Sequence, residues 1–156
     1  MISKIVGPDR VKRKFAQISA DMERAIREGV FATAQKVRGE AIKSIATVSI
    51  GEMVRRQTSA GGGYNHIASK AGDAPNTDTG ALARSIALEP KDPAKSIGVG
   101  SALKYAKWLE FGTISEDGKK LMDARPYLEP ALEAKKSGLT KEIKKSIKRQ
   151  LAESKK

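Results

Sequence analysis

The side chains most often used in catalysis are few in this sequence, and their spacing forms no recognisable constellation. The chain has one histidine, His66, and no cysteine, so thiolate chemistry and cysteine-ligated metal sites do not arise. The central carboxylates are too scattered for a calcium loop or an acid–base pair; they are Asp73, Asp78, Glu110, Glu116, Asp117 and Asp123. We therefore expect no enzyme, no metal and no cofactor, and interpret His66 as a surface polar residue.

Three consecutive glycines at 61–63 raise the question of a phosphate-binding loop. Such a loop needs a lysine followed by serine or threonine and opens a helix. Here the glycines are followed by Tyr64 and Asn65. We therefore interpret them as a hinge or a loop tip.

Positive charge is the strongest chemical signal in the chain. The chain has 30 Lys and Arg residues and 18 Asp and Glu residues, which gives a net charge of +12. Residues 135–156 hold nine of these cations and two glutamates, and phosphates or an acidic protein rim would attract them equally well. A third interpretation is that these cations only make the helix surface soluble and bind no partner. The candidate contacts of DNA or of an acidic partner are Lys141, Lys144, Lys145, Lys148 and Arg149.

The elements that must position these groups indicate an α+β fold in a single domain, residues 1–156. Apolar residues recur at steps of three, four or seven from Val11 to Ile45, which predicts one long amphipathic helix within residues 1–46. Its glycines, Gly29 and Gly39, are where bending would cost least. Such a helix is longer than a domain of this size is wide, so we expect neighbouring subunits to cover part of it.

The rest of the chain divides into three segments. Residues 47–80 are rich in Gly, Ser, Thr and Asn, which indicates an extended flexible loop. Residues 81–134 predict the compact α+β core: a hairpin over 86–100 that forms a small antiparallel sheet, a short helix ending at Gly112, a polar loop over 114–123 and a closing helix. Residues 135–156 predict a basic helical tail after a break at Gly138. No stretch approaches the ~20 apolar residues of a membrane span, so we expect no membrane partner.

Aromatic residues cluster in the short helix of the core. Tyr105, Trp108 and Phe111 could form a stacking platform for nucleic acid, but their helical spacing favours packing in the core and at an interface. The candidate interface residues are Tyr105, Trp108, Leu109, Phe111, Arg125 and Tyr127.

Three stretches together resemble one known family: AGDAPNTDTGALARSI at 71–86, VGSALKYAKWLEFGT at 99–113 and ARPYLEPAL at 124–132. In order and spacing they are similar to the neck and minor-tail proteins of long-tailed bacteriophages, described as head-tail joining or tail-completion proteins. Within the matching residues, Arg125 and Pro126 are expected to start the closing helix. Glu110 and Arg125 are expected to form an ion pair that joins the two helices.

The resemblance implies a structural virion protein that is made in the host cytoplasm and works mechanically. It implies a ring around the DNA passage, with six copies as the expected number because tails of this class are generally sixfold. The implied partners are copies of the chain, neighbouring neck, tail-terminator or tail-tube proteins, and the DNA in the channel. A basic nucleic-acid-binding protein, driven by the +12 charge, is the alternative hypothesis.

Overall fold

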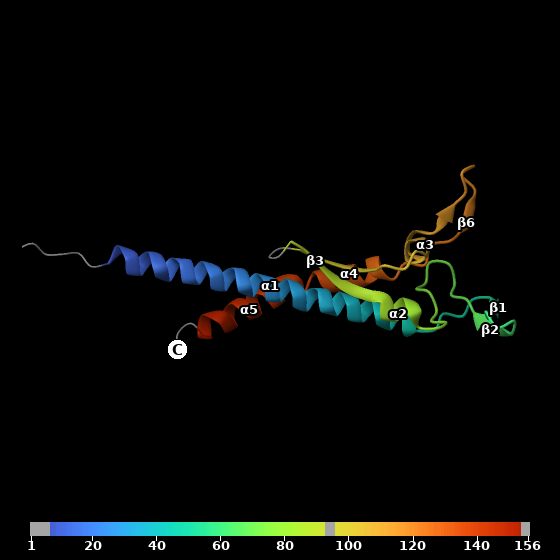
Figure 1. Cartoon of the computed structure of the whole chain (residues 1–156), viewed down its shortest axis with the longest axis horizontal. Coiled ribbons are helices and arrows are strands. Elements are labelled where there is room, and N and C mark those ends of the chain that lie inside the picture. The colour runs from blue at the N-terminus through green and yellow to red at the C-terminus, as the bar shows by residue number, and fades with distance from the viewer. Residues whose placement is uncertain (1–6, 93–95, 154–156) are drawn as a thin grey trace, which may run out of the picture.

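The computed structural model describes residues 7–92 and 96–153. It is an elongated, rod-shaped α+β molecule, and one long helix runs along most of its length (Figure 1). The elements in chain order are α1 (Pro8–Ala46), β1 (Met53–Gln57), β2 (Gly63–Ile67), α2 (Ala81–Ser85), β3 (Ile86–Asp92), β4 (Ser96–Ser101), α3 (Ala106–Phe111), β5 (Thr113–Ile114), β6 (Lys120–Met122), α4 (Leu128–Lys136) and α5 (Leu139–Glu153). None of the described helices is both long and apolar enough to cross a membrane.

Helix α1 confirms the long amphipathic helix expected from the sequence. It has 39 residues and is therefore about 58 Å long at ~1.5 Å per residue. Pro8 occupies its first turn, where the missing N–H is not needed. The helix ends at Thr47, whose backbone is extended. Residues 1–6 of the expected N-terminal segment lie outside the described residues.

Helices α4 and α5 return along α1 in the opposite direction. Three ion pairs fix this alignment, because they join successive points of α1 to successive points of the closing helices: Glu40 with Lys135, Lys36 with Glu142, and Glu28 with Arg149. The expected break at Gly138 lies between the two helices.

Gly29 has a role beyond the one expected. It lies where α5 packs directly against the backbone of α1. A Cβ at Gly29 would lie 2.7 Å from the Cα of Ile143, so only glycine permits this contact. Gly39, by contrast, has open space around it.

The strands form three separate two-stranded antiparallel sheets beside these helices. The expected hairpin is β3–β4, in which Leu88 pairs with Val99 and Pro90 pairs with Ile97. Residues 93–95, between the two strands, lie outside the described residues. The other two hairpins, β1–β2 and β5–β6, occupy segments expected to be irregular.

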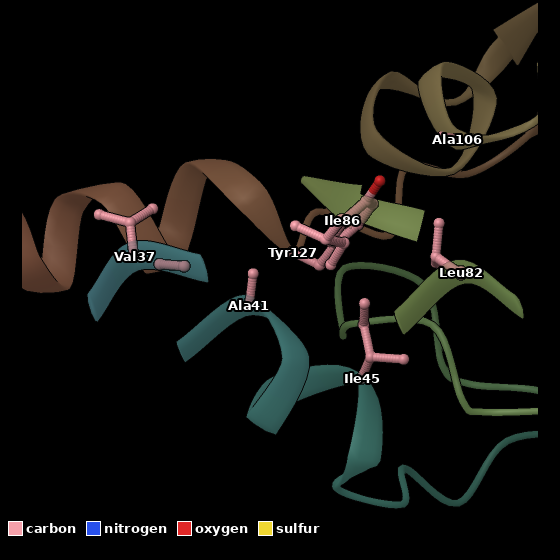
Figure 2. Close-up of a cluster of buried hydrophobic side chains, with 8 residues drawn as sticks. Val37, Ala41, Ile45, Leu82, Ile86, Ala106 and Tyr127 are labelled. Atoms are coloured by element: carbon pink, nitrogen blue, oxygen red, sulfur yellow. The ribbon is translucent and has the colours of Figure 1, made fainter. Parts of the chain in front are cut away.

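The core lies between the C-terminal part of α1 and the elements that follow it (Figure 2). Its buried members are Val37, Ala41, Ile45, Leu82, Ile86, Ala106, Tyr127 and Ala131. Three of them belong to α1, so the core is not confined to residues 81–134. Its largest side chain is Tyr127, which is 1% exposed.

The segment from 47 to 80 is tied down by one asparagine. The side-chain oxygen of Asn76 accepts a hydrogen bond from the backbone N–H of Ser49 at 2.8 Å, and its amide donates to the carbonyl oxygens of Ser49 and Ile67 at 2.6 and 2.9 Å. Ser49 also donates to Asp73. These bonds close the base of the β1–β2 hairpin and give the segment a defined conformation.

Candidate functional site

Helix α3 and the β5–β6 hairpin form one unit near the end of the rod opposite the start of α1 (Figure 1). Gly112 makes the turn between them, with a φ of 74°. A Cβ at that position would lie 2.6 Å from the carbonyl oxygen of Met122, so a larger residue would be both strained and obstructed. The N–H of Arg125 donates to the carbonyl oxygen of Leu109 at 2.6 Å, which holds the returning chain against α3.

Glu110 joins α3 to α4, but not through the ion pair that the sequence suggested. Its carboxylate accepts hydrogen bonds from the backbone N–H groups of Tyr127, Leu128 and Glu129 at 2.9–3.1 Å. These are N–H groups at the start of α4 that have no partner within the helix. A negative charge is also favourable there, because the helix dipole is positive at its N-terminus.

Arg125, the expected partner of Glu110, turns elsewhere. Its Nε donates to the carbonyl oxygen of Ser69 at 3.3 Å. It therefore links the residues before α4 to the 47–80 segment. The expected ion pair was wrong because the backbone of α4 satisfies the carboxylate.

The candidate interface residues fall into two groups. Tyr105, Trp108 and Phe111 are exposed, and Phe111 reaches 78% exposure. Leu109 is half-buried and packs on the core. Tyr127 is itself a core residue and presents no surface to a partner.

Two further apolar residues on the same unit were missed from the sequence. Ile114 of β5 and Leu121 of β6 are 72% and 65% exposed. They stand in the polar-looking 114–123 segment, where isolated apolar residues gave little signal. We call these five residues the distal apolar surface: Tyr105, Trp108, Phe111, Ile114 and Leu121.

The neighbouring 47–80 segment adds more exposed apolar side chains at this end of the molecule, namely Val48, Ile50, Met53 and Ile67. Soluble monomers rarely leave so many large apolar side chains uncovered in one region. A region of this kind is typical of a protein–protein contact surface.

A cleft of about 760 Å³ lies between the β1–β2 hairpin, α2 and α3. Asp78 lies on its wall, where its carboxylate accepts a 2.6 Å hydrogen bond from the Tyr64 hydroxyl and lies 3.9 Å from Arg56 and 3.8 Å from His66. The hydrogen bond to Asp78 and, to a smaller extent, desolvation raise the pKa of Tyr64. The His66 side chain is only 11% exposed, so His66 is a wall residue of the cleft and not the open-surface residue expected.

This arrangement is a structural tie between the hairpin and the residues before α2. Across residues 7–92 and 96–153, no three His, Cys, Asp or Glu side chains converge as a metal site would require.

The candidate basic residues lie on α5. At about 100° per residue, Lys141, Lys144, Lys145 and Lys148 share one face of that helix. This face is opposite Ile143, Ile147 and the buried Gln150, which face inward. None of the four lysines forms an ion pair with a described residue, whereas Arg149 is paired with Glu28.

A comparison with known families finds a match for most of the chain. The model described as "Bacteriophage HK97-gp10, putative tail-component" matches residues 9–112, which is 104 of the 156 residues and runs from α1 through α3 to Gly112. No significant match was found to curated proteins or to solved structures. The match includes the first of the three stretches recognised in the sequence and all but Thr113 of the second, and it ends before the third. The chain therefore belongs to the HK97 gp10-like family of phage tail components.

Proposed function

We propose that this chain is a head-tail joining or tail-completion subunit that forms a ring around the DNA passage of a phage neck or tail. The observation that carries the proposal is the distal apolar surface, which rigid elements hold in place and which no part of the described chain covers. Family membership supports a structural role in the virion. The distal apolar surface supplies the contact through which such a role would be performed.

The shape of the subunit suits a head-to-tail contact. Most of the exposed large apolar side chains lie at one end of the rod, so each copy would press this end against a different surface of the next copy. Repeated contacts between unlike surfaces generate a ring when the rotation closes. Six copies would match the sixfold tail, and the ring faces would meet neighbouring neck, tail-terminator or tail-tube proteins.

The four unpaired lysines of α5 fit the same proposal. They form a positive face on the side of α5 that points away from α1, where it would meet the DNA in the channel. A channel lining of this kind binds phosphates without reading sequence.

The proposal is tested by measuring assembly of the purified chain, alone and mixed with tail-tube or connector proteins. We expect ring-sized particles by light scattering and electron microscopy, and expect Phe111→Ser to abolish them. Phe31→Ser is the matched control, because Phe31 is also an exposed phenylalanine but lies on α1, away from the distal apolar surface. A chain that stays monomeric at every concentration with every partner, or a Phe111→Ser variant that assembles normally, would overturn the proposal.

A further inference from the structure

The first turns of α1 extend beyond the helix that covers the rest of it. Helix α5 ends at Glu153, and its last described tie to α1 is at Glu28, which accepts hydrogen bonds from Arg149 and Gln150. Asp21 is the first buried residue of α1. None of residues 8–20 is buried, so this part of the helix projects as an arm (Figure 1).

The arm and the turn after it carry an apolar stripe that the described residues do not bury. Val11, Phe15, Ile18 and Met22 follow one another at steps of four, three and four. At about 100° per residue these side chains lie within about 60° of each other around the helix. Phe15 is 68% exposed, although its spacing is that of the a and d positions of a coiled coil.

The order of residues along the arm identifies what covers it. We infer that the stripe pairs with the same stripe of a second copy, antiparallel, about a two-fold axis between Ala16 and Gln17. In this register Val11 packs against the partner subunit's Met22, and Phe15 packs against the partner subunit's Ile18. Each layer then joins an a position to a d position, as antiparallel coiled coils do.

The charges along residues 8–24 favour this direction. Residues 8–16 are net positive, with Asp9 against Arg10, Lys12, Arg13 and Lys14, whereas residues 17–24 are slightly acidic, with Asp21 and Glu23 against Arg24. A parallel pair would place the two basic clusters side by side, which is unfavourable. The antiparallel pair places each basic half beside the partner's acidic half. The arm is therefore complementary to itself, which favours a second copy over an unrelated protein.

The pair does not depend on the proposed place in the virion. It is a two-fold contact that uses one patch twice, whereas a ring is closed by contacts between unlike patches. The arm and the distal apolar surface lie at opposite ends of the rod (Figure 1), so one subunit is able to use both. The arm would then join two subunits before assembly or join two rings.

Cysteine cross-linking tests the direction and register, because the chain has no cysteine of its own. We expect a disulfide when the full-length Val11→Cys and Met22→Cys variants are mixed under mild oxidation. Each variant alone should not cross-link, because its two cysteines would be about 16 Å apart along the helix axis, too far for a disulfide. Efficient cross-linking of Val11→Cys with itself, or none in the mixture, would overturn the proposal.

Sedimentation measures the energetic role of the stripe. All chains in this measurement also carry Phe111→Ser, so that association through the distal apolar surface does not contribute to the measured dimer formation. We expect Phe15→Glu to weaken dimer formation at least tenfold while the circular dichroism spectrum is unchanged. Ala20→Glu adds the same charge to the outward face of the arm, where Ala20 is exposed, and should dimerise like its parent. Equal dimerisation of the Phe15→Glu and Ala20→Glu chains would contradict the stripe as the contact.

Discussion

The carboxylate of Glu110 lies 3.0 Å from the backbone nitrogen of Tyr127, and this contact joins helix α3 to the core. Because the same carboxylate also binds the next two N–H groups of α4, Glu110 caps a helix that belongs to another part of the chain. The side chain that orients the distal apolar surface is thus the one that starts the closing helix.

Replacing Glu110 with alanine should destabilise the protein strongly. Glu110 is 7% exposed, so the substitution leaves backbone N–H groups without a partner where water is scarce, at an expected cost of about 2–4 kcal/mol in the free energy of unfolding. Glu110→Gln keeps one acceptor oxygen and should lie between. Glu133→Ala removes only an exposed ion pair with Lys136 and should cost less than about 0.5 kcal/mol. Urea unfolding of the three variants measures this order, and equal losses for Glu110→Ala and Glu133→Ala would refute the cap.

Two glycines of α1 should respond in opposite directions to the same substitution. Gly29→Ala places a methyl group 2.7 Å from the backbone of Ile143, so α5 must shift, at a cost of about 1–3 kcal/mol. Gly39→Ala meets open space and should stabilise the helix by about 0.5–1 kcal/mol. Thermal unfolding of both variants tests the packing of α5 on α1. A stabilised Gly29→Ala chain would mean that α5 does not lie where the structure places it.

The sequence predicted the elements whose signals are local. The steps between Val11 and Ile45 predicted α1, the alternation around Leu88 and Val99 predicted the β3–β4 hairpin, and Gly138 predicted the break between the closing helices. In each case the signal lies in residues that are close together in the sequence, so local sequence was sufficient.

Contacts between distant segments were beyond the same reasoning. The spacing of Glu110 and Arg125 in the sequence is compatible with an ion pair. Only the three-dimensional structure shows that the backbone N–H groups of α4, and not Arg125, bind the Glu110 carboxylate. The role of Gly29 depends on Ile143, which is more than a hundred residues away in the sequence. The β1–β2 hairpin is closed by Asn76, which lies outside both strands. Because the segment is rich in glycine and serine, its composition predicted a loop and not a hairpin.

Alkaline pH should destabilise the protein through Tyr127. Burial, with smaller effects from Glu110 and Tyr105, raises the pKa of Tyr127 to about 12. The folded state therefore holds this proton more tightly than the unfolded chain, whose tyrosines titrate near pH 10. The stabilisation is complete below about pH 10 and is lost as the pH rises toward 12.

Tyr127→Phe isolates this effect. The Tyr127 hydroxyl, drawn in red in Figure 2, has no hydrogen-bond partner among the described residues. Its removal should stabilise the protein at neutral pH by about 1 kcal/mol and flatten the fall in melting temperature between pH 10 and 12. Tyr105→Phe, at an exposed site, should melt like the wild type throughout. A Tyr127→Phe chain with the same alkaline profile as the wild type would contradict the buried phenol as the cause.

The lysine face of α5 should determine how the protein binds DNA. Each phosphate neutralised by a cation contributes about 0.9 to the slope of log K against log salt. Replacing Lys141, Lys144, Lys145 and Lys148 with glutamine should therefore lower that slope by about 3–4 for a nonspecific duplex, measured by fluorescence anisotropy. The control replaces four exposed lysines elsewhere, Lys43, Lys70, Lys107 and Lys119, which removes the same charge without removing the face. An equal loss in both variants would show that DNA responds to net charge alone. An unchanged slope in the α5 variant, together with lost binding to a neighbouring tail protein, would instead assign the face to an acidic protein partner.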